Sequence, residues 1–118
     1  TITEGMLYTL KDIFFDTDRA ELLPRSYIEL DKLVALMKKH PNMVIEVNGH
    51  TDVRGGERYN MALSKKRARS VVDYLMEKGV AAKRTQFDGL GSTQPLATND
   101  TEAGRQLNRR VTFLVLQK

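Results

Sequence analysis

The sequence predicts an α/β fold (of the α+β type), in which two main helices pack on a mixed four-stranded sheet. Two long segments with helical periodicity alternate with β-prone segments in the order β-α-β-α-β-(short α)-β. Helical crossovers make the first three strands parallel, and the last strand is expected to join the same sheet antiparallel. With 118 residues and 41% hydrophobic content, the chain suits a single domain over 1–118.

The first half of the chain is expected to hold a strand and an amphipathic helix. Residues 7–15, LYTLKDIFF, predict a strand that is buried mainly near its carboxyl end. Pro24 suits a first helical turn, and Ser26 with Glu29 has the spacing of a capping box. The helix should end near His40, and its apolar stripe follows the i, i+3, i+4, i+7 rule at Leu30, Leu33, Val34 and Met37.

The second half adds three strands, a long helix and a short one. Residues 43–49 predict a strand, and residues 58–78 predict a helix that ends before Gly79, a typical residue after a helix C-terminus. Residues 84–91 form a weaker third strand, 98–108 a loop with a short helix, and 111–117 the last strand. The apolar stripe of the long helix consists of Ala68, Val71, Val72 and Leu75.

Polar residues gather where the parallel strands are expected to end. Ligands of open α/β sheets bind at the carboxyl ends of the strands. The first strand runs into Asp16 and Asp18, the second into Asp52, and Asn60 follows in the first turns of the long helix. An antiparallel last strand brings Arg109 to the same edge. The sequence therefore predicts a polar rim built from four distant segments.

Arg67 is expected to face inward on the long helix. It lies one turn before Val71, about 40° away around the helix axis, so it borders the apolar stripe. Burying an unpaired charge is costly. We therefore expect a carboxylate near Arg67, either Asp52 or Asp18 of the rim or the carboxylate of a ligand.

Two other function classes compete with a polar ligand pocket. One is a metal-dependent hydrolase that uses Asp16, Asp18, Asp52 and His50. The haloacid-dehalogenase pattern needs Gly-Thr after its second aspartate, and here Arg19 and Ala20 follow. The other is an anion- or nucleic-acid-binding module that uses the basic helix, although no aromatic residues interleave with its charges. We predict no catalytic residues and no metal site.

The composition further limits the kinds of site and of membrane-spanning segment that the chain can have. The absence of cysteine excludes disulfides and thiolate zinc sites, and the net charge of +4 falls short of a nucleic-acid signature. No apolar stretch approaches the roughly 20 residues that span a bilayer, and the start TITEGM lacks the basic and apolar regions of a signal peptide, so we expect none in this piece. The first residue is not Met, so we expect a mature or excised piece of a longer protein, with any anchor outside it.

Together these residues resemble the OmpA-like C-terminal domain family of bacterial envelope proteins. The likeness extends from IFFDTDRAEL, residues 13–22, to the last strand. Its core is GHTDVRGGERYNMALSKKRARSVVDYL, residues 49–75, in which Gly-His-Thr-Asp, Asn, Leu-Ser and Arg-Ala stand at the family's spacings. A second block is GLGSTQPLATNDTEAGRQLNRRV, residues 89–111. Two long ordered blocks make the resemblance specific.

The resemblance implies non-covalent binding of peptidoglycan through the diaminopimelate of its stem peptide. In the family pattern Asp52 receives the ammonium and Arg67 the carboxylate of the free diaminopimelate end. Asn60, Arg109 and the segment with Thr17 and Asp18 line the rest of the pocket. Arg54 either contacts a sugar or a stem carboxylate or faces water, and we expect it to face water.

The same likeness implies a setting for the domain. It would face the periplasm as a noncatalytic domain without a cofactor or a nucleic-acid partner. An N-terminal anchor outside this chain would attach it to the outer membrane, and the resemblance leaves both monomer and dimer open.

Overall fold

The structure is a computed structural model that describes residues 2–118. Within that range the strands are β1 (Leu7–Leu10), β2 (Val44–His50), β3 (Thr85–Gly91) and β4 (Val111–Gln117). The helices are α1 (Tyr27–Lys39), α2 (Glu57–Glu77) and α3 (Glu102–Asn108), with 3₁₀ turns at Pro24–Ser26 and Ala82–Arg84. The predicted order of elements is confirmed, and α2, β3 and β4 lie within one residue of their expected bounds.

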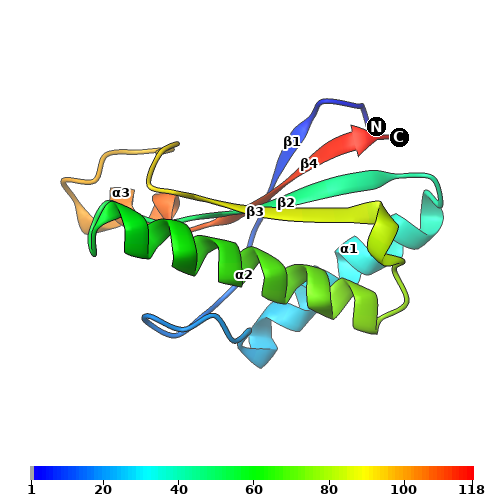
Figure 1. The fold of residues 1–118 in the computed structure, drawn as a ribbon, viewed down its shortest axis with the longest axis horizontal. Helices are drawn as coiled ribbons and strands as arrows, with labels where there is room; N and C mark the ends of the chain where they lie inside the picture. Colours follow the sequence, from blue (N-terminus) through cyan, green and yellow to red (C-terminus); the bar gives the residue numbers. More distant parts are fainter. Residues whose placement is uncertain (1) are drawn as a thin grey trace.

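The strands form one sheet in the order β1-β4-β2-β3. β2 and β3 pair in parallel, and β4 pairs antiparallel with both β1 and β2. β1, β2 and β3 therefore point in one direction, as the sequence predicts, and β4 lies between β1 and β2. Figure 1 shows α1 and α2 against the same face of the sheet, with the start of β1 and the end of β4 at the end of the sheet opposite α3.

The core lies between this sheet face and the two long helices. The predicted stripes of both helices are buried, and they meet inward-facing strand residues such as Ile45, Val47, Phe113 and Val115. Each such side chain contributes about 1.5–3 kcal/mol when it is fully buried. Helix α2 ends as expected, because Gly79 takes the positive φ of 102° that favours glycine after a helix. Among the described residues, no helix combines the length and apolar character needed to cross a membrane.

The prediction of a first strand over residues 7–15 is wrong at its carboxyl end. β1 stops at Leu10, and Asp12 adopts a positive φ of 56° that ends the extended chain. Ile13, Phe14 and Phe15 then run in a half-buried loop that makes one isolated bridge, between Phe15 and Leu22. An apolar run is typical of a buried strand, but this one pairs with none of the four strands, and its backbone bonds to the segment just before α1 instead.

The expected capping box at Ser26 is also wrong. The Ser26 side chain makes no capping hydrogen bond at the start of α1. Its buried hydroxyl accepts a hydrogen bond from the Phe14 backbone N–H at 2.7 Å and lies 3.2 Å from the Phe14 carbonyl oxygen. The arginine beside it, Arg25, stacks over the Phe14 ring at 4.2 Å from the ring centroid. These contacts hold the loop that follows β1 against the helices.

Helix α2 approaches the sheet closely at two glycines. A methyl group at Gly49 would overlap the Ser64 carbonyl oxygen, and one at Gly89 would overlap the Lys65 nitrogen. This contact fixes the height of the first half of α2 above the ends of β2 and β3. The polar residues of that half are thereby held at the edge of the sheet.

We expect Gly49→Ala to destabilise the fold by about 3 kcal/mol or more, because the added methyl meets rigid helix backbone. Urea unfolding measures the loss. Gly5→Ala is the matched control: nothing lies within 4 Å of the added methyl, and only the positive φ of 81° opposes it. That control should cost only about 1–2 kcal/mol. Equal losses for the two variants would contradict close packing at Gly49.

Candidate functional site

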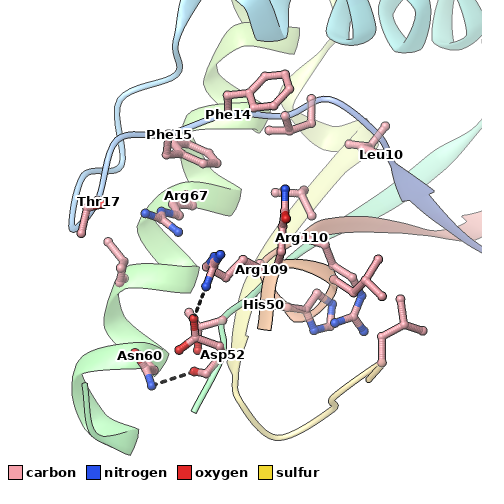
Figure 2. Close-up of a pocket in the computed structure, with 18 of the residues that line it drawn as sticks. Leu10, Phe14, Phe15, Thr17, His50, Asp52, Asn60, Arg67, Arg109 and Arg110 are labelled. Atoms are coloured by element: carbon pink, nitrogen blue, oxygen red, sulfur yellow. Dashed lines mark hydrogen bonds and ion pairs between the residues drawn. The ribbon is translucent and has the colours of Figure 1, made fainter. Parts of the chain in front are cut away.

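A groove of about 1300 Å³ opens where the predicted rim lies. Its walls are the loop after β1, the end of β2, the first half of α2, helix α3 and the start of β4. The residues that the sequence assigned to the site all line it: Thr17, Asp18, Asp52, Asn60, Arg67 and Arg109. Figure 2 shows Asp52, Arg67 and Arg109 approaching one another from different segments.

Asp52 is the buried anion of the groove, with only 5% of its surface exposed. Its carboxylate accepts hydrogen bonds from the Arg54 backbone N–H at 2.9 Å and from Arg54 Nε and Nη2 at 3.3 and 3.1 Å. Arg109 Nη1 donates to it at 2.6 Å. Burial raises the pKa of Asp52, but the hydrogen bonds from Arg54 and Arg109 outweigh burial and lower it to about 2. Asp52 is therefore ionised at neutral pH.

The lowered pKa predicts a pH dependence of stability. The folded-state pKa of about 2 lies below the ordinary value of 3.8, so the contribution is fully present above about pH 3.8 and is lost as the pH falls through 2. We expect Asp52 to contribute on the order of 1 kcal/mol, because exposed Arg54 is screened by water. Urea unfolding at several acid pH values measures the loss, and Asp52→Asn should lack this part of it. The same acid slope in both proteins would contradict the ionisation of Asp52.

Arg67 faces the groove half-buried, as its place on α2 predicts. Its Nε donates to the Arg19 carbonyl at 2.8 Å and its Nη2 to the Asp16 carbonyl at 3.2 Å. The guanidinium also lies over the Phe15 ring, 4.8 Å from the centroid. Burial lowers the pKa of Arg67, and nearby negative groups oppose that effect only in part.

A carboxylate that pairs with Arg67 is not found among residues 2–118. None of the ion pairs formed by residues 2–118 includes Arg67. Asp18 and Asp52 act on it only through their electrostatic field. Neutral backbone carbonyls therefore anchor the guanidinium, and its charge remains available to an anion that enters the groove.

Asn60 shapes the loop between β2 and α2. It is buried, and its amide nitrogen donates to the carbonyl oxygens of Asp52 at 3.2 Å and Arg54 at 2.9 Å. The loop turns through Gly55 and Gly56, which have positive φ values of 98° and 84°. Asn60 thus holds the backbone on both sides of the Asp52 turn, and Figure 2 shows its bond to the Asp52 carbonyl.

The segment with Thr17 and Asp18 forms the opposite wall of the groove. Asp18 adopts a positive φ of 61°, and its carboxylate accepts a hydrogen bond from the Tyr59 hydroxyl at 2.7 Å. That bond ties the loop after β1 to the first turn of α2. Tyr59 therefore holds the Asp18 side chain in place beside the groove. The Arg67 side chain holds the same loop through the backbone carbonyl oxygens of that loop.

Sequence reasoning missed three residues that act on the site: Arg54, Tyr59 and Glu102. Glu102 of α3 accepts a hydrogen bond from Arg109 at 2.8 Å and lies 3.9 Å from the Arg54 guanidinium. The expectation that Arg54 faces water is wrong in part, since its guanidinium binds Asp52 although 61% of the side chain is exposed. The spacing Asp-x-Arg in the loop was the available signal for Arg54. The sequence contained no such signal for Glu102, because this residue lies on a separate helix.

Three of the four side chains considered for a metal-dependent hydrolase, His50, Asp18 and Asp52, make other contacts. His50 is buried, and its Nε2 pairs with the Thr112 hydroxyl at 3.0 Å. Burial and the charge of Arg110 lower the pKa of His50 to about 4. In the part of the chain that the structure describes, no group of three or more His, Asp or Glu side chains is arranged to hold a metal ion. The basic residues Lys65, Lys66 and Arg69 of α2 are exposed outside the groove.

Comparison with known proteins assigns the chain to a family and shows the same fold in solved structures. The model of the OmpA family matches residues 14–109 of the chain. The chain belongs to the OmpA family. The crystal structure of the peptidoglycan-associated lipoprotein from Burkholderia pseudomallei superposes with a TM-score of 0.80 and 32% identity, covering 87% of this chain and 87% of that one. The cell wall anchor of the T6SS from Pseudomonas aeruginosa gives 0.80 and 29%, covering 95% and 80%.

Curated OmpA-family relatives agree with the structural matches. Outer membrane porin F of Pseudomonas fluorescens is 43% identical over 100 residues, covering 85% of this chain and 31% of the porin. Peptidoglycan-binding protein ArfA of Mycobacterium tuberculosis is 42% identical over 103 residues, covering 87% of this chain and 32% of ArfA. The chain thus spans about a third of the length of these two relatives. The predicted α/β architecture is the one shared with the structural matches.

Proposed function

We propose that residues 1–118 form a single domain that binds peptidoglycan non-covalently and tethers an envelope protein to the cell wall. The observation that carries this proposal is the charge arrangement of the groove. Buried Asp52 is ionised, and Arg67 is anchored by carbonyl oxygens with no ion-pair partner in the described chain. An anion and a planar cation on one groove suit a zwitterion.

The ligand we propose is the free end of diaminopimelate in the stem peptide, which carries an ammonium and a carboxylate on one carbon. Asp52 receives the ammonium, and the open side of the Arg67 guanidinium receives the carboxylate. Arg109 and Asn60 keep the Asp52 turn in place, and Thr17 and Asp18 form the facing wall. A lysine at the same place in the stem would offer the ammonium alone.

The relatives support the class of ligand. Two of them are named for peptidoglycan, the ArfA protein and the peptidoglycan-associated lipoprotein, and a third is described as a cell wall anchor. We propose that this domain faces the periplasm and that an anchor outside the chain attaches it to the outer membrane. It acts by binding alone, and its affinity is modest because a small polar epitope buries little apolar area.

Sedimentation with purified, insoluble peptidoglycan tests the proposal. The protein should pellet with sacculi whose stem peptides contain diaminopimelate, and free diaminopimelate should release it. A protein that remains in the supernatant at every sacculus concentration would contradict peptidoglycan binding. Retention that free diaminopimelate leaves unchanged would place the contact on another part of the polymer.

A further inference from the structure

The Asp52 carboxylate already carries a full set of hydrogen-bond donors. A carboxylate offers about four acceptor positions on its two oxygens. Oδ1 accepts from the Arg54 backbone N–H at 2.9 Å and from Arg54 Nε at 3.3 Å. Oδ2 accepts from Arg54 Nη2 at 3.1 Å and from Arg109 Nη1 at 2.6 Å. An ammonium that enters the site must therefore replace one of these donors.

Two of the donors are fixed by further contacts. The Arg54 backbone N–H belongs to the turn that Asn60 holds by the carbonyl oxygens on either side. Arg109 binds Asp52 with one nitrogen and Glu102 with the other, at 2.6 and 2.8 Å, and only 30% of its side chain is exposed. Removing either donor would break a second interaction as well.

The Arg54 side chain is the donor that can leave. It is 61% exposed, so water can replace the hydrogen bonds that it gives up. Its Nη2 also lies 3.9 Å from the Glu102 carboxylate, so a second anion is already within reach. The backbone hydrogen bond of the same residue to Asp52 can stay in place while the guanidinium moves away.

We propose that the Arg54 guanidinium is a displaceable internal occupant of the ammonium site on Asp52. It leaves the carboxylate when a ligand ammonium enters, moves to Glu102, and thereby sets how tightly the groove holds an amino-acid end. This inference rests on the proposed function. Its consequence is that removing the Arg54 side chain strengthens binding, whereas removing an ordinary contact residue weakens it.

Isothermal titration with free diaminopimelate tests the inference. Arg54→Ala keeps the backbone N–H and removes the competing guanidinium, so its affinity should rise roughly two- to fivefold, which is the strength of an exposed ion pair. Arg58→Ala is the matched control. It removes the same charge from an exposed position of α2 outside the groove and should leave the affinity unchanged.

A second measurement, the pKa of Asp52, tests the inference in the protein without ligand. NMR titration of the Asp52 carboxyl carbon should show a higher pKa in Arg54→Ala than in the wild type, because burial is then opposed only by Arg109 and by the backbone N–H of residue 54. Equal pKa values would overturn the inference, since Arg54 would then not occupy Asp52 in solution. Equal or weaker binding by Arg54→Ala, or equal strengthening by Arg58→Ala, would overturn it as well. Absence of binding by both the wild type and Arg54→Ala would instead overturn the proposed function, and the inference with it.

Discussion

Asp52→Ala is expected to abolish retention of the protein by insoluble peptidoglycan. The substitution removes the buried carboxylate that the proposed ammonium needs, and it leaves Arg54 and Arg109 with Glu102 as their remaining carboxylate neighbour. Hydrogen bonds between charged groups contribute about 1.5–3 kcal/mol, so the affinity should fall by roughly 10- to 100-fold. Sedimentation with sacculi over a range of concentrations measures the change.

Matched variants separate this effect from unfolding. Asp73→Ala removes an exposed carboxylate of α2 whose partner Arg69 lies 3.9 Å away, and it should be retained like the wild type. Asp52→Asn keeps the size of the side chain and removes the charge, so it should lose retention while its circular dichroism stays native. Full retention of both Asp52 variants would show that the ammonium site lies elsewhere.

Arg67→Lys is expected to weaken binding by about tenfold or more, although the charge is conserved. A lysine ammonium cannot present the planar pair of N–H groups that a carboxylate accepts in bidentate form. It also cannot hold the carbonyl oxygens of Asp16 and Arg19 while it faces the groove. Titration with free diaminopimelate measures the loss. Arg69→Lys, on an exposed face of the same helix, should bind normally.

Arg67 has a structural role that the experiment must separate from ligand binding. Its guanidinium fastens the loop after β1, so Arg67→Lys should also lower the melting temperature by a few degrees. Pimelate, which has the carboxylates of diaminopimelate without its amines, serves as a second probe. A variant that melts earlier but binds diaminopimelate with wild-type affinity would leave Arg67 a loop anchor only.

Much of the fold could be predicted from local patterns in the sequence. Helical periodicity located α1 and α2, and Gly79 marked the end of α2. The place of Asp52 in the groove followed from the rule that parallel strands end at a common edge, and that of Arg67 from its position beside the apolar stripe of α2. These features depend on residues close in sequence or on a general rule of sheet topology, and both can be inferred without coordinates.

The errors occur where distant side chains override a local pattern. The apolar run Ile13–Phe15 looks like a strand, but the Ser26 hydroxyl holds Phe14 in a loop, so no ladder forms. Ser26 itself has the spacing of a capping residue, yet its hydroxyl bonds to the Phe14 backbone and does not cap the helix. The contact between Asp18 and Tyr59 likewise joins segments 41 positions apart, and no periodic pattern encodes it.

Recognition of diaminopimelate by the groove is tested most directly by NMR titration of the ¹⁵N-labelled domain with two stem tripeptides, one ending in diaminopimelate and one in lysine. We predict saturable shifts centred on Asp52, Asn60 and Arg67 for the diaminopimelate peptide. The lysine peptide should bind at least tenfold more weakly, because it lacks the carboxylate that Arg67 receives. Equal affinities for the two peptides, or shifts confined to residues outside the groove, would contradict recognition of the diaminopimelate end by Asp52 and Arg67.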